Sequence, residues 1–305
     1  MTTFSIVLPC FNAQATIPDT LDGLTAQTFA DWEAICVDDG STDTTTDLIA
    51  QAATADPRIR LLRNPGKGPS AARNFGAANA TGEVIAFCDA DDIWMPGKLA
   101  ELAVAFADPS VDAGFGRIGF FTRAPEDATV FSTVPAGDLS IAMLLGENPV
   151  CTMSNIALRR RAFETTGGFD ATMVHNEDLE WLIRLVGKGA RVVGLPSLHT
   201  MYRTSTGGLS SDLGAMLSGR ARAIETAARF GVAPDGRSHA IHHRYLARRA
   251  LRLGEGRTLA LRHALRGLAH SPTGFFSPLR RGALTLLGSL AALTLPRKTR
   301  QFLFS

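Results

Sequence analysis

The chain has 305 residues, of which 45% are hydrophobic and 20% charged, and this composition fits a globular protein with a sizeable core. Its formal net charge of +2 conceals an asymmetry, because residues 239–305 hold twelve Arg or Lys and one acid. The longest apolar run in this basic tail, residues 282–296, is shorter than the roughly 20 residues that cross a bilayer, which argues against a membrane span.

Short β-like and helical runs alternate over the first 110 residues. The expected strands are residues 4–9, 32–39, 59–64 and 83–92, and the expected helices are 15–27, 45–55, 68–80 and 96–107. This alternation predicts βαβ units and a mainly parallel sheet. Ligands of such sheets bind beyond the carboxyl ends of the strands. Residues 9–12, 38–39 and 89–92 should therefore share one edge of the sheet.

The alternation loosens beyond residue 110. Further strands are expected at 111–121 and 152–160, and an amphipathic helix is expected over 176–189. From Leu213 onward the pattern is helical and basic. We therefore expect two domains, an α/β domain over residues 1–212 and a basic helical region over 213–305.

Three aspartates, Asp89, Asp91 and Asp92, follow the apolar run of residues 84–88. Like charges placed together repel one another unless a cation, or a ligand that brings one, is bound beside them. The Asp89-Ala90-Asp91 motif offers the hard oxygen ligands that Mg²⁺ and Mn²⁺ prefer, with coordination positions left for water and phosphate. The alternative is an aspartate-rich turn that precedes the next helix.

Two further segments have the chemistry of a nucleotide site. Asp38 and Asp39 end an apolar strand before a Gly-Ser turn, where a carboxylate can accept hydrogen bonds from a nucleobase or a ribose. Turn formation alone also explains them. Residues 64–74 are rich in glycine and place Lys67 and Arg73 near a helix start, where basic groups and backbone N–H groups can meet a diphosphate. The alternative is an ordinary surface loop.

Glu177 and Asp178 lie in the first turn of the helix expected after Asn176. The positive end of the helix dipole favours ionised carboxylates. An ionised, partly buried carboxylate near an acceptor hydroxyl is a competent general base. Simple complementation of the dipole would explain the same two acids.

These motifs, in this order, resemble those of family 2 glycosyltransferases, and the resemblance covers about the first 210 residues. It rests on the segments SIVLPCFNAQATIPDTLDGLTAQTF, VDDGSTD, GPSAARNFGAANATGEVIAFCDADD and GGFD…NEDLEWLIRL. The resemblance implies the GT-A fold, a Rossmann-like and mainly parallel sheet flanked by helices. It also implies an inverting enzyme of cell-surface polysaccharide biosynthesis, which moves a sugar from a nucleotide-diphospho-sugar, UDP-linked by family habit, to a hydroxyl of a glycan or lipid-linked acceptor.

The same resemblance implies roles for individual residues. Asp91 and Asp89 are the implied ligands of Mg²⁺ or Mn²⁺, and Asp178 is the implied catalytic base. Asp39 is favoured over Asp38 for the edge of the base. The implied donor-binding residues are Pro9, Asn12, Asp38, Asp39, Arg73, Asp89, Ala90, Glu177, Tyr202 and Arg203.

Two segments extend this picture. Residues 199–210, with Gly207 and Gly208, resemble a flexible segment that closes over the diphosphate. The acceptor is expected to contact residues 115–175, including Asn155 and His175. The QxxRW element of processive polysaccharide synthases is absent from residues 199–210, so transfer of a single sugar is expected.

The basic tail favours an anionic membrane surface, which suits a lipid-linked acceptor. Its alternative is a helical cap with solvated arginines. Nucleic acid is not expected, because Tyr245 is the one aromatic residue among the central arginines. Cysteines without CxxC spacing and the lack of a secretion signal predict a cytoplasmic protein, either free or peripheral at the inner membrane face.

Two rival functions stay open at this point. One is a nucleotide-sugar-binding protein without catalysis, which the three acids Asp89, Asp91 and Asp178 disfavour. The other is a nucleotidyltransferase of related fold, which would need a Gly-rich, basic signature directly after the first strand. This chain has PCFNAQAT there.

Overall fold

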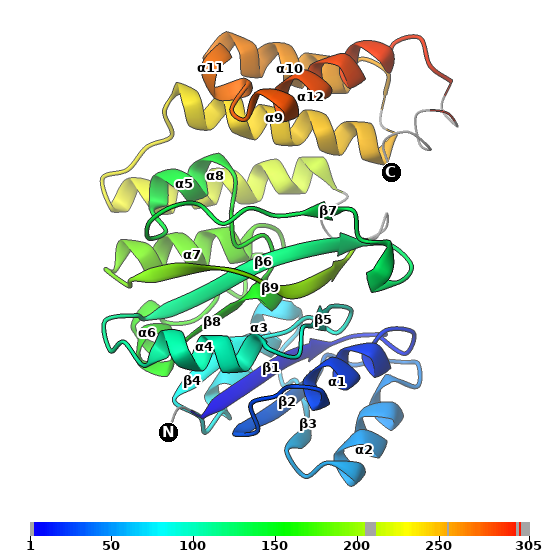
Figure 1. Cartoon of the computed structure of the whole chain (residues 1–305), viewed down its shortest axis with the longest axis vertical. Helices are drawn as coiled ribbons and strands as arrows, with labels where there is room; N and C mark the ends of the chain where they lie inside the picture. Colours follow the sequence, from blue (N-terminus) through cyan, green and yellow to red (C-terminus); the bar gives the residue numbers. More distant parts are fainter. Residues whose placement is uncertain (1–2, 205–211, 255, 297–298, 300–305) are drawn as a thin grey trace. The chain divides into compact units, whose positions relative to one another are not determined.

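A computed structural model describes residues 3–204, 212–254, 256–296 and 299 (Figure 1). The chain divides into two compact units. The first unit comprises Met1–Leu139 and Pro149–Ser205, and the second comprises Ser140–Asn148 and Thr206–Ser305. The single domain boundary expected at residue 212 stays a prediction. The internal segment 140–148 belongs to the second unit although it lies within the sequence of the first.

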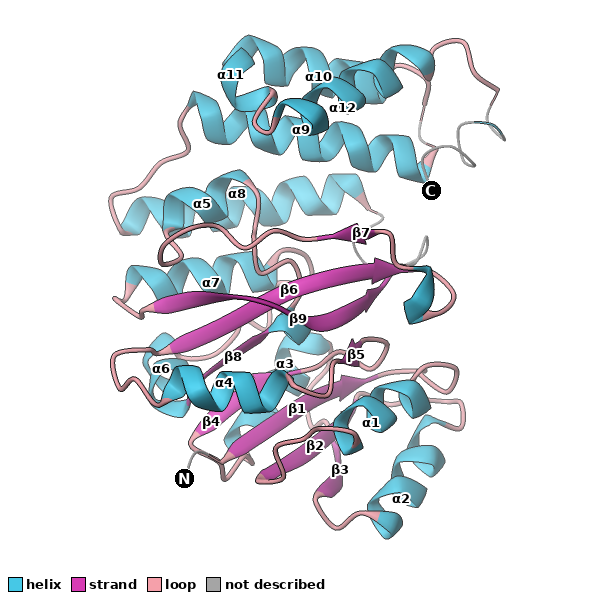
Figure 2. Cartoon of the chain, in the orientation of Figure 1, coloured by secondary structure: helices cyan, strands magenta, loops and turns pink. Residues whose placement is uncertain are grey.

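Within the described residues, nine strands of the first unit form one sheet in the order β3-β2-β1-β4-β8-β6-β9-β5, with β7 paired to β6 (Figure 2). The strands are β1 (Phe4–Cys10), β2 (Trp32–Asp38), β3 (Ile59–Arg63), β4 (Val84–Phe87), β5 (Ile93–Trp94), β6 (Ala113–Phe121), β7 (Val130–Phe131), β8 (Ile156–Arg159) and β9 (Val192–Arg203). The first four are parallel, β8 is antiparallel to β4 and β6, and β9 runs parallel to β6. The α/β fold class is confirmed, with a sheet that is parallel at one end and mixed beyond it.

Helices cover both faces of the parallel strands, which explains why β1 is a continuous apolar run. On one face, Ile17, Ile49 and Leu99 from three helices pack into the same core as Phe4 and its alternate neighbours in β1. On the other face α3 lies so close that a Cβ at Gly76 would be 2.4 Å from Val7 Cγ1. The helices of this unit are α1 (Ile17–Thr25), α2 (Thr45–Ala55), α3 (Pro69–Ala78), α4 (Lys98–Phe106), α6 (Arg160–Thr166) and α7 (Glu177–Gly187), with 3-10 turns η1 (Pro125–Asp127) and η2 (Met153–Asn155).

Strand β9 differs most from the sequence-based expectation. It pairs with β6 and β5, although residues 199–203 were expected in a flexible closing segment. Most of its side chains are partly buried and it contains Gly194 and Pro196, so it shows no clear alternation. Residues 205–211 of the expected segment lie outside the described part of the chain.

The strand expected over residues 83–92 is also shorter than predicted, because β4 ends at Phe87. The backbone leaves the sheet there: the Asp89 N–H donates to Ser154 Oγ at 2.9 Å rather than to a strand. Three cysteines of this unit, Cys10, Cys36 and Cys88, are buried and unbridged. Cys151 is exposed.

The second unit is helical. It consists of α5 (Ile141–Gly146), α8 (Leu213–Arg229), α9 (Gly236–Leu253), α10 (Leu259–His270), α11 (Pro272–Phe275) and α12 (Leu279–Ala291). Its apolar clusters are built mainly from alanine, with Phe275 as the one large buried ring. Small side chains let these helices approach closely: a Cβ at Gly267 of α10 would lie 3.1 Å from the carbonyl oxygen of Ala240 in α9. Among the described residues, no helix has both the length and the apolar character needed to span a membrane.

Ion pairs fix the internal segment 140–148 within this unit. Glu147 accepts from Arg244 Nη2 at 3.1 Å and from Arg281 Nη1 at 3.0 Å. Arg244 is 2% exposed, and it also donates to the carbonyl oxygen of Phe275 at 3.0 Å. The single acid of the segment therefore serves two arginines from different helices.

Five of the seven histidines of the chain lie on α9 and α10: His239, His242, His243, His263 and His270. The Nδ1 atoms of His243 and His263 are 3.2 Å apart, and the His270 ring stacks on that of His239 with 4.8 Å between centroids. Burial, and then the charge of His263, lower the pKa of His243 to about 4. Burial also lowers the pKa of His263. The pair is therefore neutral at neutral pH.

Candidate active site

The candidate site forms where β1, β2 and β4 end. Cys10 pairs in register with Asp38, and Val7 pairs with Phe87, so the carboxyl ends of these parallel strands lie along one edge. The loops that follow them contain Asn12, Asp39 and the Asp89–Asp92 run. This is the arrangement that the sequence predicted.

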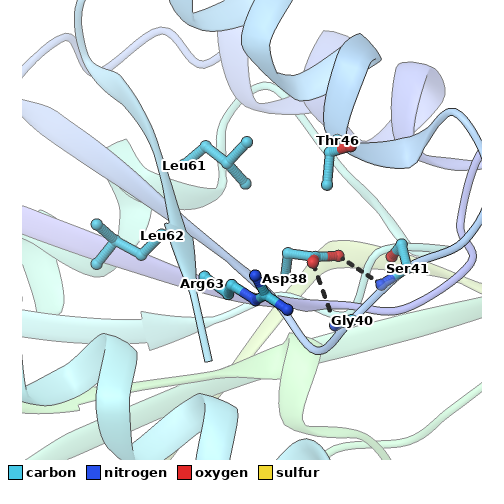
Figure 3. A pocket seen from close by; sticks show the side chains of 7 residues that line it. All are labelled: Asp38, Gly40, Ser41, Thr46, Leu61, Leu62 and Arg63. Carbon is cyan, nitrogen blue, oxygen red and sulfur yellow. Dashed lines mark hydrogen bonds between the residues drawn. The ribbon is translucent and has the colours of Figure 1, made fainter. Parts of the chain in front are cut away.

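Asp38 and Asp39 point to different partners although they are neighbours. The Asp38 carboxylate accepts from the N–H groups of Gly40 and Ser41, both at 3.1 Å, and so closes its own turn (Figure 3). Gly40 has a φ of +89°, a backbone conformation that glycine adopts readily. Both oxygens of Asp38 are thus engaged in the local turn, as the turn-forming alternative described.

The Asp39 carboxylate instead connects β2 to the start of α3. Its Oδ1 accepts from Asn64 Nδ2 at 2.7 Å and its Oδ2 accepts from the Gly68 N–H at 2.9 Å. Lys67 Nζ donates to the Asp39 carbonyl at 2.8 Å. Gly68 is the residue before Pro69, which begins α3, so Asp39 lies beside the positive end of that helix.

Asn12 joins the loops after β1 and β2. It has a φ of +47°, its Oδ1 accepts from the Thr42 N–H at 2.9 Å, and its own N–H donates to Ser41 Oγ at 3.0 Å. Pro9 is a partly buried residue inside β1. Direct contact of Pro9 and Asn12 with a donor stays a prediction.

A cavity of about 430 Å³ opens next to this turn. Figure 3 shows the residues that line it, which come from the end of β2, from α2 and from β3: Asp38, Gly40, Ser41, Thr46, Leu61, Leu62 and Arg63. The cavity includes Asp38 but not Asp91 or Asp178. It lies beside the predicted acids and does not contain them.

Arg73 of α3 forms ion pairs with two acids of the candidate site. Its Nη2 pairs with Asp89 Oδ1 at 2.7 Å and its Nη1 with Glu177 Oε1 at 3.1 Å, and the residue is 6% exposed. Burial opposes its charge, but the two carboxylates raise the pKa of Arg73 above its ordinary value. Arg73 therefore stays charged and connects the loop after β4 to the start of α7.

The remaining oxygen of Asp89 is also bound, because Thr152 Oγ1 donates to Asp89 Oδ2 at 3.2 Å. Ser154, whose Oγ accepts from the Asp89 N–H, lies in the same turn, η2. Sequence reasoning missed both residues. Their segment was predicted to be a strand, and no local signal relates it to a loop more than sixty residues earlier.

A buried lysine supports the same turn and was missed as well. Lys98 is fully buried, donates to the Ser154 carbonyl and to Thr200 Oγ1, the latter at 3.2 Å, and lies 3.8 Å from the centroid of the Trp94 ring. Burial lowers its pKa to about 7. In the sequence Lys98 is an ordinary residue at a helix start.

Asp91 and Asp92 have the crowding expected of a cation site. Burial, and then the charge of Asp89, raise the pKa of Asp91 to about 6. Asp92 is fully buried, its Oδ1 accepts from the Arg203 N–H at 3.0 Å, and its Oδ2 has no hydrogen-bond partner. In the described part of the chain, no three His, Cys, Asp or Glu side chains are grouped to hold a metal.

The donor chemistry nevertheless fits a divalent cation. Asp89 and Asp91 provide two carboxylates, and Mg²⁺ or Mn²⁺ complete their coordination with water and substrate phosphates. A cation would also relieve the repulsion that raises the pKa of Asp91. Ala90 between them is buried, and its carbonyl accepts from Thr16 Oγ1 at 2.8 Å, which fixes the loop.

Tyr202 and Arg203 lie at the end of β9. Arg203 Nε donates to the Asp91 carbonyl at 3.0 Å, and its Nη2 pairs with Asp19 at 2.7 Å. Arg203 therefore holds the aspartate loop itself, while its predicted contact with a diphosphate stays a prediction. The Tyr202 ring meets Phe120 edge to face, with 5.7 Å between centroids.

Asp178 lies in the first turn of α7, one residue after Glu177. Burial, and then the charge of Glu177, raise the pKa of Asp178 to about 7. A carboxylate that titrates near neutral pH can take up a proton during a reaction and release it afterwards. The charges of Arg73 and Asp89 also influence the pKa of Asp178, so its carboxyl group lies within electrostatic range of both.

Asn155 was expected near the acceptor, and here the structure differs. Its side chain is fully buried, and its Nδ2 donates to the carbonyls of Gly116 and Val150 at 2.8 and 3.1 Å. Asn155 therefore has a structural role. His175 is partly exposed in the loop before α7, and its contact with an acceptor stays a prediction.

Comparison with proteins of known family shows what this chain is similar to in sequence. The profile of the family described as Glycosyl transferase family 2 matches residues 5–167. An uncharacterized glycosyltransferase of Nostoc sp. is 31% identical over 166 residues, which are 52% of each chain. The chain thus spans about half the length of that relative. A UDP-Glc:alpha-D-GlcNAc-diphosphoundecaprenol beta-1,3-glucosyltransferase of Escherichia coli, WfgD, is 29% identical over 68% of this chain and 79% of its own.

Solved structures agree on the fold. TarS residues 1–349 of S. aureus, determined in complex with UDP-GlcNAc, has a TM-score of 0.60 at 17% identity and covers 95% of this chain and 81% of its own. The mannosyltransferase PcManGT of Pyrobaculum calidifontis, determined with GDP-Man and Mn²⁺, has a TM-score of 0.61 at 21% identity and covers 99% and 83%. The chain has the GT-A fold and belongs to glycosyltransferase family 2, and the protein is a glycosyltransferase.

Proposed function

We propose that this glycosyltransferase is inverting and metal-dependent, and that it moves a single sugar from a UDP-linked donor to a hydroxyl of a lipid-linked or glycan acceptor. The observation that supports this most directly is the pair of bonds from Arg73 to Asp89 and Glu177. They bring the aspartate motif and the first turn of α7 to one guanidinium. Asp178, the next residue in the chain, is close enough to Arg73 and Asp89 for their charges to influence its pKa.

We assign the donor to the edge formed by Asp39 and α3. The Asp39 carboxylate, with Asn64 beside it at 2.7 Å, is suited to the N–H edge of a base. Backbone N–H groups at the start of α3 favour the diphosphate. Arg73 and Lys67 add positive charge there. UDP is the favoured nucleotide because WfgD is named for UDP-Glc and TarS was determined in complex with UDP-GlcNAc, whereas PcManGT was determined with GDP-Man.

Asp89 and Asp91 would hold Mg²⁺ or Mn²⁺ in the complex with the donor. When bound, such a cation neutralises negative charge on the departing nucleoside diphosphate. The PcManGT complex contains Mn²⁺. Two protein carboxylates are enough, since the donor phosphates and water supply the other ligands.

In the transfer step, a carboxylate oxygen of Asp178 accepts the proton of the acceptor hydroxyl. The hydroxyl oxygen forms a bond to the anomeric carbon while the bond from that carbon to the diphosphate oxygen breaks. One displacement with one base inverts the anomeric configuration. Glu177, held by Arg73, fixes the start of α7 and keeps Asp178 in place.

The same relatives support a proposal for the class of acceptor and for the place in the cell where the enzyme works. WfgD is named for an acceptor linked to undecaprenol through a diphosphate. We propose an acceptor of this class, a role in cell-surface polysaccharide biosynthesis, and an enzyme that works in the cytoplasm at the inner face of the membrane. The buried free thiols suit that reducing compartment.

The test is product analysis with UDP-Glc, UDP-GlcNAc and GDP-Man in the presence of Mn²⁺ or of a chelator. We expect release of a nucleoside diphosphate that requires the cation. Release of pyrophosphate would instead indicate nucleotidyl transfer. A nucleotide sugar that stabilises the protein in thermal unfolding but is never turned over would indicate a binding protein.

The assignment of Asp178 needs its own variant. Asp178→Asn should keep donor-induced thermal stabilisation and lose turnover by about 10²–10⁴-fold, the usual contribution of a general base. The matched control is Asp47→Asn, because Asp47 lies in the first turn of α2 and complements that helix dipole without any catalytic role. Equal loss of donor binding and turnover in Asp178→Asn would remove its assignment as base.

A further inference from the structure

We propose that α12 is a docking surface for an anionic lipid bilayer. The surface consists of four exposed leucines, and we call it the leucine face of α12: Leu279, Leu284, Leu287 and Leu290. It belongs to the helical unit and takes no part in donor binding. The inference therefore goes beyond sugar transfer, and its test does not depend on turnover.

The exposure of these leucines is high and one-sided. Their exposed fractions are 71%, 59%, 61% and 47% in chain order. Each residue of an α-helix advances by about 100°, so positions 279, 284, 287 and 290 fall within one arc of the helix surface. Of the eleven large apolar side chains exposed in the described residues, these four lie on a single helix of 13 residues.

The buried side of the same helix has the opposite character, because it is formed by Gly282, Thr285, Gly288 and Ser289. The hydroxyls of Thr285 and Ser289 each donate to a carbonyl one turn earlier, at 2.7 Å. A helix that only needed to cover a core would bury its leucines and expose its small and polar residues. Helix α12 packs Leu286 against the helical core but leaves its other four leucines exposed.

Packing fixes this orientation. A Cβ at Gly282 would lie 2.6 Å from the carbonyl oxygen of Phe275, so the contact surface has no room for a larger side chain. Rotation of α12 would bring leucines to that contact and is excluded by it. The leucine face is therefore a property of the folded helical unit.

The charge around the face indicates the kind of partner. Residues 236–291 contain ten arginines and one acid, Glu255, and of these arginines Arg244 is buried and pairs with Glu147, as does Arg281. Arg280 is exposed beside Leu279, at the start of the leucine face. Leucines flanked by arginine on a helix too short and too polar to span a bilayer are typical of helices that lie in the interface of an anionic membrane.

A bilayer fits these residues better than a protein partner does. Protein interfaces are enriched in Tyr, Trp, Phe and Met, whereas the exposed arc of α12 contains leucine, alanine and arginine. An α-helix of 13 residues is about 20 Å long, enough to lie along the headgroup region. Contact with such a surface would bring the enzyme to a lipid-linked acceptor, which is where this inference meets the proposed function.

The test is sedimentation of the whole chain with vesicles of phosphatidylcholine, alone or mixed with phosphatidylglycerol, in the absence of donor and acceptor. We expect binding to the anionic vesicles and weaker binding to the neutral ones. The double variant Leu284→Gln/Leu287→Gln should bind roughly 25-fold more weakly, about fivefold for each exposed leucine. Gln keeps helix propensity close to that of Leu, so thermal unfolding should be unchanged.

Two further variants make the result specific. Val104→Gln is the matched control, because Val104 is 77% exposed on α4 of the other unit, and it should leave vesicle binding unchanged. Arg280→Gln should weaken binding to anionic vesicles about fivefold and leave binding to neutral ones unaltered. Vesicle binding that is absent, or equal in the double variant and the parent, would overturn the proposal.

The alternative occupant is a second copy of the chain. If light scattering shows a dimer without vesicles that becomes monomeric in the Leu284→Gln/Leu287→Gln variant, the leucine face is a protein interface and the proposal fails. Because no sugar is transferred in these measurements, they separate the docking surface from the proposed reaction.

Discussion

The two units of this glycosyltransferase carry net charges of opposite sign. The first holds twenty-four acidic and fifteen basic residues, a formal charge of −9, and the second holds five acidic and sixteen basic residues, a formal charge of +11. Among the described residues, the buried acidic and basic side chains of the first unit are Asp38, Arg73, Asp92, Lys98, Glu177, Glu180 and His199, whereas those of the second are Arg220, Arg244 and His263. The first unit therefore buries acids together with basic groups, whereas the buried ionisable groups described in the second unit are arginines and a histidine.

This difference shows how each unit is prepared for its partner. Crowded acids attract positive charge, and in the first unit Arg73 already provides part of it. The second unit has too few acids to neutralise its arginines, so its surface favours anions. The comparison can be tested by variants made in pairs, one in each unit.

The largest effect is expected where one buried cation serves two acids. Arg73→Met removes the partner of both Asp89 and Glu177, and it should lower the free energy of unfolding by about 3–5 kcal/mol, the cost of leaving buried charge unpaired. Arg244→Met in the second unit should cost less, because Glu147 is 35% exposed and keeps Arg281. Urea denaturation of both variants measures the difference. Equal losses would show that Arg73 is not the centre of the acid cluster.

The dependence of turnover on pH is the next largest effect. The base must be ionised, and the pKa of Asp178 is raised to about 7, so the rate at saturating donor should fall about tenfold per pH unit below 7. The pH dependence of folding stability has the opposite sign to that of turnover. A raised carboxyl pKa adds stability that is fully present below about pH 4 and is lost as the pH rises through 7.

Glu177→Gln sharpens this measurement. It removes the neighbouring charge that raises the pKa of Asp178, so the rate profile should move to lower pH. A turnover rate that is constant between pH 6 and pH 8 in the parent enzyme would assign the base to another residue.

Glycine-to-alanine variants test how tightly the helices pack within each unit. Gly76→Ala places a Cβ 2.4 Å from Val7 Cγ1, and the overpacking should cost about 1–3 kcal/mol of unfolding free energy. Gly146→Ala in α5 meets Ile241 at 3.6 Å, an ordinary contact, and should be nearly neutral. Thermal unfolding compares the pair. Similar values would mean that α3 can move away from the sheet.

The histidine cluster should give the smallest effect. The pKa of His243 is lowered to about 4, so neutral His243 stabilises the fold above about pH 6.5, and this contribution is lost as pH falls through 4. His263→Gln removes one of the neighbouring imidazoles and should reduce the loss of stability between pH 6.5 and pH 4. His175→Gln in the first unit is the control and should leave the pH dependence as it is.

Much of the first unit could be predicted from sequence because its signals are local. Alternating runs gave β1 to β4 and α1 to α4 within a few residues, and acids at the strand ends predicted the edge that they share. The roles of Ser154 and Lys98 could not be predicted, since they depend on contacts between distant segments. Strand β9 was missed because its side chains are mostly half-buried and lack alternation.

For the helical unit, the sequence indicated helices and basic charge but not which side of each helix is covered. The leucines of α12 have the spacing of an ordinary core face. The structure shows that four of them point outward while Gly282, Thr285, Gly288 and Ser289 are buried, and that the fifth, Leu286, is partly buried. Which side of a helix is exposed depends on the helix packed against it and cannot be derived from the periodicity of its sequence.

The assignment of residues 140–148 to the helical unit has a consequence for how this enzyme can be altered. The polypeptide passes between the units three times, after residues 139, 148 and 205. A chimaera that exchanges only residues 213–305 with a relative would separate Glu147 from Arg244 and Arg281. Successful recombination must therefore transfer the internal segment together with the tail, and the two stretches should be inherited as one module.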